Sequence, residues 1–188
     1  MNKNKQLAEV FKHEFIIHKK ALLSFAYSLC LNEAYSKDLV QETYYKAIKG
    51  FQSYTSNSNA KAWLFQILKN IFINEYRKKS KRKITNLKDE SLIANSIKDI
   101  NYIKHNDLRV ELIQNTIGDV LYNALNKLNI KHRTILLLYD VEEFSYAEIS
   151  TILSCPIGTV RSRLFRARQR MKTLLAPYKG KLGIPSKR

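Results

Sequence analysis

The spacing of the apolar residues constrains the fold of this 188-residue chain more than any other feature. Apolar residues recur mostly at intervals of three and four, the period of an amphipathic helix, and no alternating pattern predicts a strand. Glycine and proline, which interrupt helices, occur only five and three times. The sequence therefore predicts an all-α protein.

Three helices are expected in the first half of the chain. The first spans residues 5–30 and the second spans 36–49, with Ser36 as N-cap and Gly50 at its end. The third runs from about Ala60 to Lys79. The inner face of the first helix is expected to contain Phe11, Phe15, Leu22, Phe25, Ala26 and Leu29.

A polar stretch interrupts this helical pattern. From Ser80 to about Asn106 the residues offer no amphipathic face, which is typical of a linker. A helical rhythm resumes over 107–129 and continues to Leu175, before a tail with two prolines and two glycines. We therefore expect two small helical domains joined by a flexible linker.

The net charge indicates an anionic partner. Lys and Arg number 33 against 16 Asp and Glu, a formal charge of +17, which favours nucleic acid over a membrane surface. No signal peptide and no apolar run of about 18 residues are found, so no membrane insertion is expected. Cys30 and Cys155 are expected to be buried apolar side chains in a reducing, cytoplasmic setting.

Residues 144–156 predict the first helix and turn of a helix-turn-helix. Ser145 and Glu148 have the spacing of a reciprocal capping box. The tripeptide SCP predicts a tight break, and Pro156 suits the first turn of the next helix. The residues expected to face inward are Ala147, Ile149, Ile152 and Leu153.

The next helix combines an apolar stripe with a basic face. The stripe contains Val160, Leu164, Ala167, Met171 and Leu174, and the opposite side carries Thr159, Arg161, Ser162, Phe165, Arg166 and Gln169. Such a helix can read base edges in a major groove. Alone it could equally be a solvated surface, a membrane-surface helix or a calmodulin-type target, but the capped helix before it favours DNA. The remaining cations are expected at phosphates or in solvent: Arg163, Arg168, Arg170 and Lys172.

These motifs resemble a known family. The stretch GTVRSRLFRAR, within FSYAEISTILSCPIGTVRSRLFRARQRMKTLL, is similar to the fourth domain of bacterial sigma factors of the sigma-70 family, extracytoplasmic-function type. Upstream, AYSLCLNEAYSKDLVQETYYKAIKGF resembles the family's polymerase-binding segment, and AWLFQILKNIFINEYRKKSKR its minus 10 recognition helix. The resemblance covers about residues 10–83 and 118–175.

The resemblance implies an organisation and a function. The expected parts are sigma domain 2 at 1–83, a linker at 84–117, sigma domain 4 at 118–176 and a basic tail at 177–188. Such a protein binds core RNA polymerase, recognises the minus 35 element as duplex, and helps melt the minus 10 element of promoter DNA. An anti-sigma factor is a further candidate partner.

For polymerase binding, the resemblance implies a surface on the 36–49 helix. Asp38, Gln41 and Glu42 would be its polar contacts and Leu39 an apolar one. Without the resemblance, a solvated helix face is the simpler interpretation.

For the minus 10 element, the resemblance implies contacts by Tyr54, Lys69, Asn70, Ile73 and Arg77. Trapping an unstacked base requires a pocket for the base and cations for the phosphates. Tyr54 could equally be a lid on the core, and Trp63 is expected in the core.

Two positions depart from the family pattern. Asn74 replaces an aspartate, which puts a local ion pair with Arg77 in doubt. Asn129 replaces a proline after Leu128 and is expected to loosen a helix boundary.

No catalytic role is expected. The sequence has no Gly-rich phosphate loop, no Cys and His metal spacing and no paired nucleophile and base, so neither a cofactor nor a metal is predicted. His13, His18, His105 and His132 lie apart and are expected at ordinary positions.

The main alternative is a homodimeric helix-turn-helix regulator that binds an operator without polymerase. A nonspecific nucleic-acid chaperone would leave the acidic 38–42 segment without a use.

Overall fold

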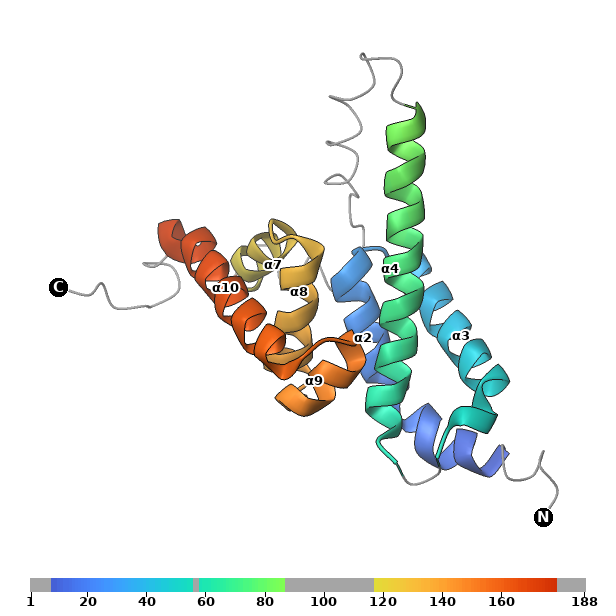
Figure 1. Cartoon of the computed structure of the whole chain (residues 1–188). Coiled ribbons are helices and arrows are strands. Elements are labelled where there is room, and N and C mark those ends of the chain that lie inside the picture. Colours follow the sequence, from blue (N-terminus) through green and yellow to red (C-terminus); the bar gives the residue numbers. More distant parts are fainter. Residues whose placement is uncertain (1–7, 56–57, 87–116, 179–188) are drawn as a thin grey trace. The chain divides into compact units, whose positions relative to one another are not determined.

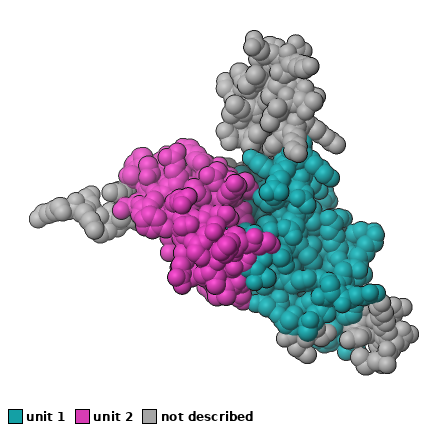
Figure 2. Space-filling view, in the orientation of Figure 1, with its two compact units in different colours: residues 1–104, 151–153 teal, residues 105–150, 154–188 magenta. Residues whose placement is uncertain are grey.

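The computed structural model describes residues 8–55, 58–86 and 117–178 (Figure 1). The chain divides into two compact units, residues 1–104 with 151–153 and residues 105–150 with 154–188 (Figure 2). The described residues form helices and turns and contain no strand. The predicted all-α class is thereby confirmed.

The first unit is built around a long helix, α4 (Ala60–Asn86), which packs against α3 (Glu33–Lys49), α2 (Lys19–Cys30) and the turn η1 (Phe11–Phe15). A second turn, η2 (Ile16–His18), joins η1 to α2, and η3 (Phe51–Ser53) follows α3. The core of this first unit includes Phe15, Leu22, Phe25, Leu64, Phe65 and Leu68.

The expected single helix over 5–30 is wrong in one respect. Residues 8–10 are α-helical, but a π-helical turn and a 3-10 turn then interrupt the helix before α2 begins at Lys19. The predicted inner face is otherwise present: Phe11 is half-buried, and the five other residues of that face are buried.

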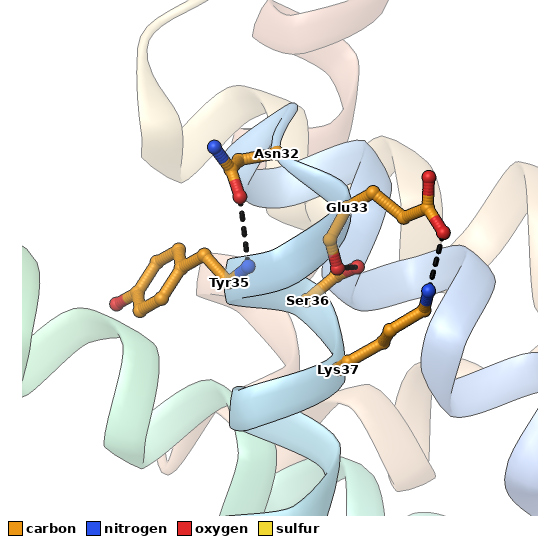
Figure 3. Close-up of polar contacts among 5 residues, drawn as sticks. All are labelled: Asn32, Glu33, Tyr35, Ser36 and Lys37. Carbon is orange, nitrogen blue, oxygen red and sulfur yellow. Dashed lines mark hydrogen bonds and ion pairs between the residues drawn. The ribbon is translucent and has the colours of Figure 1, made fainter. Parts of the chain in front are cut away.

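The predicted N-cap of α3 is also wrong. Asn32 has an extended backbone, and its Oδ1 accepts a hydrogen bond from the Tyr35 N–H at 2.7 Å (Figure 3). Ser36 lies inside the helix, where it is buried and its Oγ donates to the Glu33 carbonyl at 2.7 Å. Asparagine and serine are equally good N-caps, so residue type alone did not choose between them. The predicted end at Gly50 is confirmed.

Helix α4 begins as predicted but ends later. The Asn59 side chain accepts from the Ala62 N–H at 2.8 Å at the start of the helix. The helix then continues through the basic run to Asn86, so the interruption expected at Ser80 is wrong. The rest of the predicted linker and its flank, residues 87–116, lies outside the described part, as does the tail from residue 179.

The second unit contains α7 (Ile117–Asn126), α8 (Ile130–Leu136), the first part of α9 (Tyr146–Leu153) and α10 (Ile157–Leu175). The turn η5 (Leu137–Val141) extends α8, and η6 (Ala176–Tyr178) follows α10. Helix α10 packs against α8 and α7. Its inner face contributes Val160, Leu164 and Ala167 to the core, whereas Met171 and Leu174 are half-buried.

Asn129 stabilises the boundary between α7 and α8, although the sequence predicted that it would loosen it. Asn129 is the N-cap of α8, and its Oδ1 accepts a hydrogen bond from the His132 N–H at 2.9 Å. At the other side of the same junction, the Arg133 guanidinium donates to the carbonyls of Leu125 and Asn126 at 3.0 and 2.7 Å. These bonds satisfy the last carbonyls of α7, so both ends of the α7–α8 turn are capped.

Candidate functional site: three surfaces for protein and DNA

The helix-turn-helix has the capping box that the sequence predicts. Ser145 N–H donates to the Glu148 carboxylate at 2.7 Å, and the Glu148 N–H donates to Ser145 Oγ at 3.3 Å. Ser154, with φ of 51°, reverses the chain, and Pro156 is the N-cap of α10 rather than part of its first turn. Ile149 and Ile152 are buried and Leu153 is half-buried, but Ala147 is exposed and its inward placement is wrong.

We call the outward side of α10 the recognition face, comprising Thr159, Arg161, Ser162, Phe165 and Arg166. All of them are exposed except Thr159, which is half-buried. The Phe165 ring is 64% exposed, which is unusual for a phenylalanine on a packed helix. A continuous face of two guanidiniums, two hydroxyls and one aromatic ring provides the donors and apolar surface that base edges require.

Aromatic side chains support this face, and the sequence reasoning missed them. The rings of Tyr139 and Tyr146 stack with centroids 5.1 Å apart, and the Arg161 guanidinium lies 5.8 Å from the Tyr146 ring. Arg168, expected at phosphate or in solvent, forms an ion pair with Asp140 and lies over the Tyr139 ring. The sequence feature that could have indicated this support is Tyr146, which directly follows the capping residue Ser145.

We call the exposed strip of α3 the acidic face, comprising Asp38, Gln41 and Glu42. Asp38 and Gln41 are exposed, while Glu42 is half-buried and forms an ion pair with Lys46 at 3.6 Å. Leu39 is only 2% exposed and belongs to the core. Its expected role as an apolar contact for a partner is therefore wrong.

On α4, Asn70 and Arg77 are exposed and Ile73 is half-buried. Lys69 is only 9% exposed, and its Nζ donates to the Asn70 Oδ1 at 2.7 Å. A direct DNA contact by Lys69 is thus contradicted by its burial. The Lys69 ammonium instead orients the amide of Asn70.

Tyr54 is part of the core, which decides between the two interpretations left open by the sequence. Its ring is 9% exposed and packs against Trp63 and Phe15, with centroids 4.9 and 5.0 Å apart. Its hydroxyl donates to the Glu14 carboxylate. Burial, together with this hydrogen bond, raises the pKa of Tyr54 to about 12. A base cannot stack on this ring in the described conformation.

A tyrosine that the sequence analysis did not single out connects α3 to α4. The Tyr35 hydroxyl donates to the Glu75 carboxylate, and the Lys79 ammonium lies 4.5 Å from the Tyr35 ring centroid. Tyr35 follows the Asn32 cap by three residues (Figure 3), so the start of the helix with the acidic face is tied to the C-terminal half of α4. The partners are 40 residues apart in sequence, so no local pattern could reveal the pair.

The described residues show no helix long and apolar enough to cross a membrane. Within the same residues, no group of three or more His, Cys, Asp or Glu side chains could hold a metal ion. Cys30 and Cys155 are half-buried rather than fully buried.

Comparison with known proteins shows the family of this chain. The family model "Sigma-70 region 2" matches residues 15–82, and "Sigma-70, region 4" matches residues 118–171. The ECF RNA polymerase sigma factor EcfG of Rhodopseudomonas palustris is 31% identical over 90% of this chain and 87% of its own length. The chain belongs to the extracytoplasmic-function sigma factors of the sigma-70 family.

Other sigma factors agree with this assignment. SigM of Bacillus subtilis is 34% identical over 80% of this chain and 85% of its own length. The solved structure of the sigma factor RpoE from Bartonella quintana, in complex with the anti-sigma factor NepR, matches with a TM-score of 0.70 and 32% identity. That match covers 88% of this chain and 96% of the RpoE chain. As a sigma factor, the protein directs transcription initiation at promoters, and a homodimeric operator-binding regulator is not favoured.

Proposed function

We propose that this sigma factor binds core RNA polymerase through the acidic face of α3 and binds promoter DNA through α4 and α10. Asp38, Gln41 and Glu42 would make the polar contacts to polymerase. Their exposure on a protein with a formal charge of +17 supports a basic or polar partner surface distinct from DNA.

The recognition face carries the proposal for duplex DNA. Its side chains point away from the buried Val160 and Leu164, so α10 can enter a major groove without losing its packing. Arg161 is steered by Tyr146, which makes it the best candidate for a base contact on this face. We assign the minus 35 element to this surface because the sequence motif of α10 is that of the sigma fourth domain.

For the minus 10 element, Asn70, Ile73 and Arg77 remain the proposed contacts. Asn70 is held by Lys69, and Arg77 begins the exposed basic run on α4. A pre-oriented amide can hydrogen-bond an unstacked base, and cations can hold the flanking phosphates. Residues 56 and 57 of the preceding loop lie outside the described part.

The protein itself would carry out no covalent chemistry, since phosphodiester synthesis belongs to the polymerase. Its place would be the cytoplasm, where core polymerase acts. An anti-sigma factor is a candidate partner, because the similar RpoE was solved with one.

Run-off transcription with purified core polymerase on a pool of genomic fragments tests the proposal. Start sites should appear only with the protein, weaken in Asp38→Ala/Glu42→Ala, and shift in preference in Arg161→Ala. The absence of protein-dependent start sites, together with operator-specific binding by the protein alone, would favour the homodimeric regulator instead.

A further inference from the structure

A groove of about 580 Å³ lies beside the recognition face in the second unit. It is formed by the α7–α8 turn, the start of α8 and the middle of α10. Its lining residues are Lys127, Asn129, His132, Phe165, Arg166, Gln169, Arg170 and Thr173. Phe165 and Arg166 belong to both the groove and the recognition face.

The groove is suited to an anion. Three of its side chains, Lys127, Arg166 and Arg170, carry a positive charge and are exposed. None of the described residues that line it is a carboxylate. The remaining polar side chains, among them Gln169 and Thr173, can donate hydrogen bonds.

The side chain of Asn129 favours one tautomer of His132 in this groove. Because Asn129 Oδ1 accepts the backbone N–H of His132, the amide nitrogen of Asn129 faces the imidazole. That nitrogen lies 3.3 Å from Nδ1 of His132. This arrangement favours Nδ1 as the acceptor, with the proton of the neutral ring on Nε2. The sequence analysis treated this histidine as ordinary.

The surroundings of His132 also favour its neutral form. Burial, followed by the positive charges of Arg163 and Arg166 on α10, lowers the pKa of the imidazole below its ordinary value. Lys127 on the α7–α8 turn and Arg170 on α10 add further positive charge around the same groove. A bound anion would be attracted by all four cations and could accept from the Nε2 proton.

We propose that this groove binds one backbone phosphate of the promoter DNA duplex, with His132 as a neutral hydrogen-bond donor and Lys127 and Arg170 as its cations. The inference rests on the proposed function, because it requires α10 to lie in the major groove. A helix in the major groove of DNA has backbone phosphates on both sides of it. The groove of the protein is continuous with the base-reading side chains of α10, so it would meet one of these phosphates.

This contact should depend on Asn129. The family pattern has proline at this position, which has neither a side-chain acceptor for the cap nor an amide to hold the imidazole. The phosphate contact is therefore a property of this chain's own combination of Asn129 and His132.

The first experiment measures promoter binding by the reconstituted holoenzyme as a function of salt, on a promoter fragment recovered by run-off selection. Arg170→Ala and Lys127→Ala should each reduce the slope of log affinity against log salt, and together they should reduce it by about 0.9, the value for one phosphate, without changing the preferred sequence. Lys20→Ala is the control, because it removes one exposed charge from α2, outside the groove and outside every surface proposed to bind DNA, and should leave the slope unchanged. Equal slopes for all three variants and the wild type would overturn the inference.

The second experiment identifies the phosphate. Single methylphosphonates are placed along both strands of the minus 35 region of that fragment, each of which removes one backbone charge. One position should weaken wild-type binding roughly tenfold, as expected for a lost charge-assisted hydrogen bond, and should weaken His132→Ala distinctly less, because that variant keeps only the attraction of Lys127 and Arg170. His132→Gln, which keeps an N–H donor, should restore part of the sensitivity at that position.

The two experiments separate the inference from the proposed function. Holoenzyme that binds promoters and responds to Arg161→Ala, but shows no position coupled to His132, would overturn only the groove assignment. Holoenzyme with no specific promoter binding at all would overturn the proposed function, and the groove assignment with it.

Discussion

Helices α10 and α4 are the two DNA-binding candidates, and they differ in how much of their surface remains available. Helix α10 packs against α8 and α7 on one side and leaves a long basic side exposed. Helix α4 has α3, α2 and η1 around it, so Asn70 is its only exposed residue between Ala60 and Ile73, and exposure widens only from Asn74 to Lys79.

This difference suits two kinds of DNA recognition. Reading a duplex requires an extended face that fits a groove already present in B-form DNA. Holding an unstacked base requires a few oriented groups supported from beneath, because the site must offset lost stacking. Such support is present on α4 in Lys69, which orients Asn70, and in Trp63, whose ring packs against Tyr54.

Neighbouring residues on α10 provide the strongest test of its two-sided character. Leu164 is 2% exposed, so Leu164→Ala should lower the free energy of unfolding by about 2–5 kcal/mol. Phe165→Ala should change it by less than about 0.5 kcal/mol, because the ring is 64% exposed, while reducing binding to the minus 35 element. Urea unfolding and promoter binding measure the two effects. Similar stability losses for both variants would contradict the division into an inner and an outer face.

A comparable pair tests α4 and its loop. Tyr54→Phe removes the hydroxyl that donates to Glu14 and should cost about 1–2 kcal/mol of stability with no change in promoter preference. Asn70→Ala should leave stability near the wild-type value and impair promoter opening, as reported by permanganate reactivity of unpaired thymines. If Tyr54→Phe instead altered opening at unchanged stability, Tyr54 would be a DNA contact after all.

The sequence predicted which residues are buried well for a helix that packs on one side, and less well for helices with neighbours on several sides. On α10 the apolar spacing indicated which residues are buried, because a single packing direction makes burial follow the helical period. On α3 and α4 several neighbours surround the helix, so Leu39 and Lys69 are buried although their types or motif positions suggested contact with a partner. The number of neighbours is a tertiary property that no local period encodes.

Helix caps also show where prediction from the sequence stops. The Ser145–Glu148 box was predictable because two residues must agree in type and spacing. Asn32 and Ser36 offered two equivalent single-residue caps for α3, and the sequence did not distinguish them. Asn129 was interpreted through the proline that it replaces, although asparagine is itself a strong N-cap.

The capping box supplies a smaller test on the α10 side of the comparison. Ser145→Ala should cost about 1 kcal/mol, because it leaves the Glu148 N–H without its side-chain acceptor at the start of α9. Ser145→Asp keeps an acceptor and should recover most of the loss. Thermal unfolding of the two variants provides the comparison, and equal loss in both would mean that the serine does not stabilise α9 as a cap.

The smallest effect expected is a pH dependence that comes mainly from the first unit. Burial, followed by the charge of Lys61, lowers the pKa of His18 in the folded protein below its ordinary value of 6.5. The unfolded chain then binds the proton more tightly, so stability is fully present above about pH 6.5 and falls as the pH drops through it. His132 contributes in the same direction from the second unit. His18→Gln should therefore flatten the dependence of the urea midpoint on pH between about 7.5 and 5.5, and Lys61→Met should flatten it less because burial remains. An unchanged slope in His18→Gln would show that protonation of this histidine does not oppose folding, and would leave the acid sensitivity to the second unit.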